Sequence, residues 1–315
     1  MRRSGSPLTL EDLQAHQARL VDPLSLRHPA GELFNMTPPT QGVVSLLILG
    51  ILAELGVERV APDSADYVHL CVEATKLAFR IRDRHVTDPR YMTVDARDLL
   101  ATSAVRELAK QVDRQHAAPW GGATQPGDTI WMGVIDGEGR AVSFIQSIYH
   151  EFGSGVVLPD SGVNWQNRGC SFSLQSGSRN ELMPGRKPFH TLNPAMARLS
   201  DGRTMVYGTM GGDGQPQTQC ALFTRAIGYG FSPHDSVSAP RWLLGRTWGQ
   251  SSESLKLESR FDPAVPRELK RRGHTVEMLD DWDETVGHAG MIIRQADGSL
   301  SGGADPRSDG AVAAF

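Results

Sequence analysis

The chain has 315 residues, of which 39% are hydrophobic and 22% charged, a composition typical of a soluble globular protein rather than a disordered or fibrous one. At this length it can bury a large core, either as one α/β unit or as two ordinary domains. A formal net charge of −4, with no stripe of clustered lysine and arginine, argues against a nucleic-acid binder.

Cysteine usage and hydropathy argue against further classes. Cys71, Cys170 and Cys220 are odd in number and lack CxxC spacing, so we expect reduced thiols rather than a disulfide framework or a zinc site. The longest apolar run, residues 43–55, is too short to span a bilayer. Residues 1–7 are basic, but no apolar stretch typical of a secretory signal follows them. We expect no metal, no cofactor, no membrane partner and a cytoplasmic location.

Helical patterns fill the chain from Thr9 to about residue 116. Thr9 can cap a helix with Asp12 three residues further on, and apolar residues then recur at helical spacing. Further helices are expected over residues 43–55, closed by Gly56, over 67–81 and over 99–115.

The composition then changes. Residues 117–128 are rich in Gly and Pro and can hold neither a helix nor a central strand. Beyond this linker the expected strand pairs are 129–135 with 141–149, 196–199 with 204–207, and 291–293 with 299–301, and the expected helices are 217–227 and 264–272. Strands and helices in separate blocks favour stacked sheets covered by helices.

A threonine that starts a strand directly after this linker is the first candidate for chemistry. If the peptide bond before Thr129 were cut, its α-amine would lie beside its own hydroxyl and could act as the base for it. An α-amine titrates near pH 8, so much of it can accept a proton close to neutral pH. Spacing alone also allows Thr129 to be an ordinary residue at the start of a strand.

A glycine-rich turn before the helix expected over 217–227 is the second candidate. Gly211 and Gly212 leave backbone N–H groups free to approach a substrate oxygen, and the helix N-terminus adds positive potential, so an oxyanion hole is plausible there. The segment does not match the GxGxxG or GxxxxGK[ST] pattern of a phosphate-binding loop. A turn with a purely structural role is the remaining alternative. No GxSxG elbow and no HExxH metal spacing is present.

Taken together, these segments resemble the γ-glutamyltransferase family over essentially the whole chain. Separate motifs come in the family's order, at residues 8–13, 38–42, 73–79, 127–129, 134–136, 152–155, 211–212 and 304–307. The resemblance implies an α+β fold, the αββα sandwich of the N-terminal-nucleophile hydrolases, with a helical large-subunit segment before the nucleophile.

The resemblance also implies roles for particular residues. Self-cleavage between Asp128 and Thr129 would make residues 1–128 the C-terminal part of a large subunit and 129–315 a small subunit. Thr129 would then be the nucleophile, with Ser147 as the hydroxyl that supports it. Gly211 and Gly212 correspond to the family's paired oxyanion glycines.

The departures from the family pattern bear on the substrate. Enzymes that act on γ-glutamyl compounds grip the substrate α-amine with an aspartate of an Asp-Asp-Phe motif, where this chain has Cys170, Ser171 and Phe172. Their paired serines correspond to His190 and Thr191 and a glutamine to Arg168. The chain looks more like the oxamate amidohydrolase branch, so Arg168, Ser171, His190 and Thr191 are the expected substrate-binding residues.

The resulting interpretation is an autoprocessed, Thr-dependent amidohydrolase that hydrolyses a small carboxylated amide such as oxamate. One alternative is a glutathione hydrolase or γ-glutamyltransferase, and another is an inactive truncated member. The expected partners are the small-molecule amide and the two subunits of one precursor, whose heterodimer could form homo-oligomers. The family's large subunit begins well before the equivalent of Thr9. We therefore expect the 315-residue chain alone to expose apolar surface and to have little activity.

Overall fold

The computed structural model describes residues 5–121, 128–245 and 252–315. Its α-helices are α1 (Leu10–Ala15), α2 (Gly42–Leu55), α3 (Ala65–His85), α4 (Ala96–Leu99), α5 (Thr102–Ala109), α6 (Gly214–Phe223), α7 (Pro233–Ser238) and α8 (Ala264–Arg271). None of the helices in these ranges combines the length and apolar character needed to cross a membrane.

Three sheets accompany the helices. The largest has six antiparallel strands in the order β1 (Leu24–His28), β2 (Gly31–Asn35), β5 (Ala195–Leu199), β6 (Thr204–Thr209), β10 (Ala289–Arg294) and β11 (Leu300–Ala304). A separate hairpin pairs β3 (Asp128–Ile135) with β4 (Ala141–Tyr149). The third sheet joins β7 (Trp242–Leu244), β8 (Leu255–Glu258) and β9 (Val276–Leu279).

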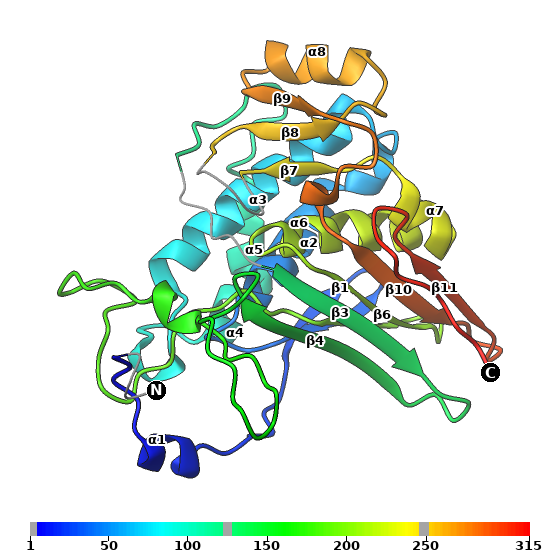
Figure 1. Ribbon diagram of the computed structural model, residues 1–315. Helices are drawn as coiled ribbons and strands as arrows, with labels where there is room; N and C mark the ends of the chain where they lie inside the picture. The colour runs from blue at the N-terminus through cyan, green and yellow to red at the C-terminus, as the bar shows by residue number, and fades with distance from the viewer. Residues whose placement is uncertain (1–4, 122–127, 246–251) are drawn as a thin grey trace.

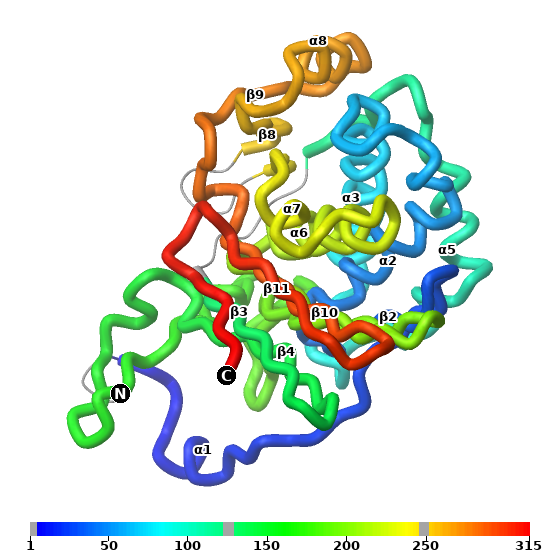
Figure 2. Tube along the Cα trace, turned by 90° about the vertical axis from the view of Figure 1, so that its right-hand side faces the viewer, coloured from blue at the N-terminus to red at the C-terminus, as the bar shows by residue number. Residues whose placement is uncertain are grey.

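The six-stranded sheet lies between a helical layer and the hairpin (Figures 1 and 2). On one side α2 contacts β1 and β2, α6 contacts β6, and α3 packs behind α2. On the other side β3 contacts β6 and β10. Helix α2 is apolar around almost its whole circumference and buried from Gly42 to Leu52, as expected for a helix with neighbours on every side. The chain thus has the α+β class with stacked sheets that the sequence predicted.

The outer face of the hairpin is apolar and exposed. Alternate residues of a strand point to opposite faces, and the outward set is between 42% and 59% exposed. Its members are Ile130, Met132, Val134, Val142 and Phe144. Isolated exposed apolar residues are normal, but five neighbours on one hairpin make a contiguous patch, which is typical of a surface that another layer covers.

Most expected elements are confirmed, and the differences have local causes. Thr9 and Asp12 form a reciprocal capping box, and Gly56 closes α2 with a φ of 66°. The helix expected over 99–115 is shorter: α4 ends at Leu99, Ala101 has a non-helical backbone with ψ at 138°, and α5 covers only Thr102–Ala109. Downstream of α5, Asp113 accepts two backbone N–H groups in a turn. Strands β1 and β2 lie in the segment where the sequence indicated mostly helices, and β2 pairs with β5 of the second half.

Candidate active site

The linker expected before Thr129 lies partly outside the described residues, but Thr129 itself is placed on β3. The residues of this strand from 129 to 135 alternate between half-buried or buried and exposed, and Thr129 belongs to the inward set with Trp131 and Gly133. Its side chain therefore lies on the face that covers the six-stranded sheet, and not on the exposed apolar face.

Contacts across the two layers show which part of the large sheet lies below Thr129. A Cβ at Gly208 would come within 2.2 Å of the Trp131 ring, and one at Gly133 within 3.1 Å of Val206. Position 131 thus lies over position 208, and 133 over 206. Continuing along β3 in this direction, Thr129 lies toward the end of β6 that enters the glycine-rich turn.

Ser147 lies across the hairpin from Thr129. Asp128 pairs with Tyr149 and Ile130 with Gln146, so the register shifts in a bulge that includes both Thr129 and Ser147. The Ser147 hydroxyl accepts a hydrogen bond from the backbone N–H of Tyr149 at 2.8 Å, and a hydroxyl that accepts one bond can donate another. Bulges are frequent beside active sites because they redirect side chains.

Tyr149 has an unusual backbone at the same point. Its φ is 82°, in the left-handed region that non-glycine residues rarely adopt, and its side chain is buried. Burial raises the pKa of its hydroxyl, and a hydrogen bond with Ser171 partly offsets that rise. A strained residue held by its surroundings beside a candidate nucleophile is a feature typical of functional sites.

The glycine turn follows β6 and leads into α6. Gly211 and Gly212 are buried and have φ values of 116° and 50°, a conformation that other residues adopt only with strain. Their carbonyls accept the backbone N–H groups of Gly214 and Gln215 at 2.7 and 3.3 Å, so both carbonyls point toward the helix. Within the described residues neither glycine N–H donates a hydrogen bond, as an oxyanion hole requires.

A buried polar network holds this turn in place. Gln41 donates from Nε2 to the carbonyl oxygens of Gly212 at 2.7 Å and Thr191 at 3.2 Å. Arg82 of α3 donates from Nη1 to Gln41 Oε1 at 3.2 Å and to Asp213 Oδ1 at 2.8 Å. The sequence analysis missed Gln41 and Arg82 as supports of the site. Gln41 lies within one of the family-like motifs, which was the available signal, but the carbonyls to which it donates lie 150 and 171 residues away in the sequence.

Arg168 is the most unusual charge near the turn. It lies in a short 3-10 turn (Arg168–Ser171), is 6% exposed, and its guanidinium carbon is 4.6 Å from the centre of the Tyr149 ring. Its Nη1 donates to Thr191 Oγ1 at 3.4 Å, while its Nη2 is buried without a hydrogen-bond partner. Burial lowers the pKa of Arg168 to about 10, with the neighbouring Tyr149 partly opposing the shift.

The remaining predicted residues lie around Arg168. Thr191 is buried and joins Arg168 to the Gln41 network. His190 lies in a bridge with Thr40, and its Nδ1 is inaccessible and unpartnered. Burial, helped by the charges of Arg168 and Lys187, lowers the pKa of His190 to about 3, so its imidazole is neutral at pH 7.

The predicted site residues thus form a connected group, from the hairpin bulge through Tyr149 and Arg168 to the glycine turn. All three cysteines are free thiols, as expected: Cys71 and Cys220 are buried, and Cys170 is exposed in the turn between Arg168 and Ser171. A hollow of about 780 Å³ beside residues 20–22 and 92–97 contains none of the predicted site residues.

The chain is similar to several known proteins. A family model described as gamma-glutamyltranspeptidase matches residues 1–315. The chain is 60% identical to the oxamate amidohydrolase proenzyme of Klebsiella pneumoniae over 315 residues, which is the whole chain and 59% of that protein. It is 40% identical to the glutathione hydrolase-like YwrD proenzyme of Bacillus subtilis over 312 residues, 99% of the chain and 59% of that protein.

A solved structure extends the likeness to the fold. The cephalosporin acylase of Bacillus halodurans is 34% identical and superposes with a TM-score of 0.85 over the whole chain and 56% of its own length. The chain therefore spans somewhat more than half the length of these relatives. On the full-length family match and these identities, the chain belongs to the gamma-glutamyltranspeptidase family.

Proposed function

We propose that the chain is the core of an autoprocessed, threonine-dependent amidohydrolase that acts on a small amide carrying a carboxylate, of which oxamate is the first to test. The observation that carries the proposal is Arg168, a buried guanidinium for which the described part of the chain supplies neither a partner for Nη2 nor an acidic group in contact. The proposal also draws on the 60% identity to a protein named oxamate amidohydrolase proenzyme.

The substrate class follows from charge. An unpaired charge in an enclosed site costs several kcal/mol, so a buried cation without an internal partner favours a ligand that supplies the anion. The planar guanidinium of Arg168 suits a carboxylate and repels an ammonium group. Cys170 and Ser171 stand where an enzyme that binds an α-amine would need a carboxylate, and neither carries one.

The proposed chemistry uses the geometry around Thr129. Its hydroxyl attacks the amide carbon while the α-amine takes the hydroxyl proton, and the N–H groups of Gly211 and Gly212 stabilise the oxyanion. The C–N bond then breaks, and the protonated α-amine returns its proton to the departing nitrogen, which leaves as ammonia. Water hydrolyses the resulting ester, releases the acid and restores Thr129.

Autoproteolysis generates the required α-amine in this proposal. The Thr129 hydroxyl attacks the carbonyl of Asp128, the acyl group moves from nitrogen to oxygen, and water cleaves the ester. The products are residues 1–128 as part of a large subunit and residues 129–315 as a small subunit. Mass spectrometry should find a fragment that starts at Thr129. Thr129→Ala should stay uncut and Thr129→Ser, which keeps a hydroxyl, should still split. A Thr129→Ala chain cut at the same bond would disprove the mechanism.

A second candidate is γ-glutamyl chemistry, favoured by the 40% identity to a glutathione hydrolase-like protein. The two are separated by comparing kcat/KM for oxamate and for a γ-glutamyl anilide in a chain extended to the length of the relatives. The proposal expects oxamate to be preferred, and Ser171→Asp to raise γ-glutamyl turnover by supplying the missing carboxylate. Efficient γ-glutamyl transfer without oxamate hydrolysis would reverse the order of the candidates.

The third candidate is an inactive member of the family. Its test needs the longer chain, because the hairpin of the 315-residue chain exposes an apolar face. A chain with five apolar side chains uncovered on the face of Ile130 and Phe144 should bind a hydrophobic dye and aggregate when expressed alone. The longer chain should be monodisperse. Failure of that longer chain to split or to turn over either substrate would favour the inactive member.

A further inference from the structure

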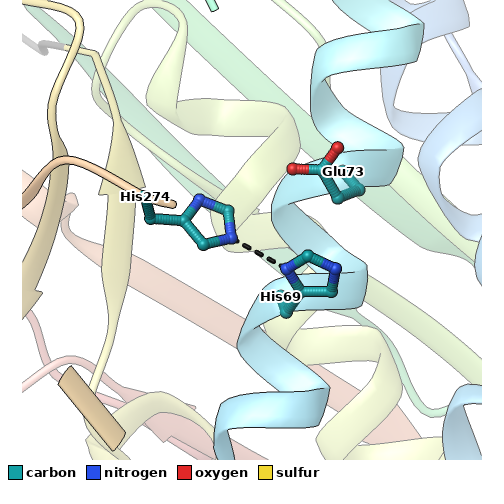
Figure 3. Close-up of side chains that lie close together, drawn as sticks. All are labelled: His69, Glu73 and His274. Atoms are coloured by element: carbon teal, nitrogen blue, oxygen red, sulfur yellow. Dashed lines mark hydrogen bonds between the residues drawn. The ribbon is translucent and has the colours of Figure 1, made fainter. Parts of the chain in front are cut away.

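A second cluster of chemically active side chains shares no residue with the candidate active site. His69 and Glu73 lie one turn apart on the same face of α3, and His274 faces them from the turn between α8 and β9 (Figure 3). All three are buried, with 0%, 3% and 7% exposure. Three groups of this kind brought together from positions 200 residues apart call for a physical explanation.

The hydrogen bonds identify which imidazole nitrogens carry lone pairs. His69 Nε2 is 2.8 Å from the carbonyl oxygen of Asp113, and a carbonyl can only accept, so Nε2 carries the proton. His69 Nδ1 is therefore an acceptor in the neutral ring, and His274 Nε2, at 2.8 Å, donates to it.

We propose that His69, Glu73 and His274 form a zinc site. Two neutral imidazole nitrogens and one carboxylate are a ligand set that zinc takes in proteins, with a fourth position left for water. The candidate ligand atoms all lie within 4.8 Å of one another. Two Zn–N bonds of about 2.1 Å at a tetrahedral angle require nitrogens about 3.4 Å apart, so the 2.8 Å pair must open by about 0.6 Å.

The surroundings already hold the ligands as zinc sites require. A histidine that binds metal usually donates its other N–H to a carbonyl or carboxylate, as His69 does to Asp113. Glu73 Oε2 accepts the backbone N–H of Ala118 at 3.1 Å, which fixes the carboxylate. His274 moves its proton from Nε2 to Nδ1 when Nε2 binds the metal, so the two rings release no net proton.

Lys76 is the competing cation. Its Nζ donates to Glu73 Oε1 at 2.7 Å and to the carbonyl of Ala118 at 2.7 Å, and it already neutralises the carboxylate. A cluster that serves only as a buried ion pair beside two neutral histidines needs no metal. The two explanations predict different results for Lys76→Met. If the cluster binds zinc, removal of the competing charge should strengthen zinc binding. If it is only an ion pair, the substitution leaves Glu73 unpaired and no zinc binds.

The position of the cluster gives the site a structural role. Asp113 and Ala118 belong to the segment that leads toward the proposed cleavage site, and Ala117 donates its N–H to the carbonyl of Arg272 at 2.8 Å. Zinc at this point would join α3, that segment and the turn after α8. It would therefore hold residues on both sides of the proposed cut together.

The test is equilibrium dialysis, against zinc alone, of a chain extended to the length of the relatives, with metal content measured by mass spectrometry. Wild-type protein should bind about one zinc per chain. His69→Ala and His274→Ala should each lose it, His234→Ala, at an exposed histidine of α7, should retain it, and Lys76→Met should bind at least tenfold more tightly. Wild-type protein without zinc, or both cluster variants with undiminished zinc, would overturn the proposal.

A second measurement removes the dependence on variants that fail to fold. Cobalt in place of zinc should give wild-type protein the intense visible absorption of a tetrahedral site, and added zinc should abolish it. Free zinc at about 100 times Kd should raise Tm by about 5 °C in wild type and in His234→Ala. No visible band and no thermal shift would each contradict the site.

Discussion

Two buried arginines near the glycine turn have opposite surroundings. Arg82 donates to Asp213 and Asp83, each at 2.8 Å, and its guanidinium carbon is 4.2 Å from the centre of the Phe79 ring. Among the described residues, the Arg168 guanidinium donates to Thr191 and lies against the Tyr149 ring, and its Nη2 has no hydrogen-bond partner. Both guanidinium groups are almost fully removed from water.

The difference also appears in the pKa values. Burial alone would lower the pKa of Arg82, but the carboxylates of Asp213 and Asp83 outweigh it and raise that pKa above its usual value. For Arg168 burial dominates and lowers the pKa to about 10. A buried charge that is paired inside the chain serves as a support, whereas one left unpaired is available to a ligand. Substitutions in the Arg82 region should therefore lower stability, and substitutions of Arg168 should lower activity.

The largest expected effect is on stability in the Arg82 region. Asp213→Asn leaves Arg82 without its fully buried partner, and removal of one member of a buried pair costs about 3–5 kcal/mol of the free energy of unfolding. Asp83→Asn removes the partner whose side chain is 39% exposed and should cost about 0–1 kcal/mol. Urea unfolding of both variants measures the difference, and equal losses would contradict the assignment of Asp213 as the main support.

The Arg168 region should respond in activity instead. Arg168→Met removes the proposed carboxylate partner, so kcat/KM for oxamate in the extended enzyme should fall by about 100-fold, or about 2.7 kcal/mol. The free energy of unfolding should stay the same or rise, because an unpaired buried charge is removed. Arg168→Lys should restore little, since an ammonium cannot make the planar two-point contact. Unchanged kinetics with a large loss of stability would make Arg168 a structural residue.

The sequence predicted the elements better than the contacts between them. Helical periodicity located α2 and α3, and hairpin signals located β3 and β4, because both depend on residues close in sequence. Strands β1 and β2 were missed; they form a local hairpin, and β2 also pairs with β5, which lies about 160 residues further on. The glycine turn was predicted from the sequence because its glycines are consecutive.

The supports of the site were much harder to predict. Gln41, Arg82 and Asp213 meet only after α2, α3 and α6 have packed, and no spacing rule links them. The same holds for His69 and His274, which lie 205 residues apart. The tail motif around Asp305 and Arg307 also proves to be a buried ion-pair network, with Arg307 bonded to Glu258 at 2.5 Å.

Backbone strain in the glycine turn gives the next largest effect. Gly211 has a φ of 116°, so Gly211→Ala should cost about 1–3 kcal/mol of the free energy of unfolding and displace the N–H groups of the proposed oxyanion hole. Gly169, beside Arg168, is the matched control because it lacks a positive φ and a Cβ there would meet nothing within 4 Å. Gly169→Ala should be nearly neutral in urea unfolding. A similar loss of unfolding free energy at both positions would show that backbone strain at Gly211 is not the cause.

Near pH 7 the smallest expected effect is that of His190, because its effect on stability grows only as the pH falls. Its folded-state pKa of about 3 lies below the ordinary value near 6.5, so between these limits the unfolded chain binds a proton that the folded chain does not. Stability should therefore fall as pH drops from 6.5 toward 3, with His190 contributing a slope of up to about 1.4 kcal/mol per pH unit. His190→Asn should flatten the curve of unfolding free energy in this window, and replacement of the exposed His234 should not. A slope unaffected by His190→Asn would mean that the buried imidazole is protonated in the folded chain, and it would then add a second positive charge beside Arg168.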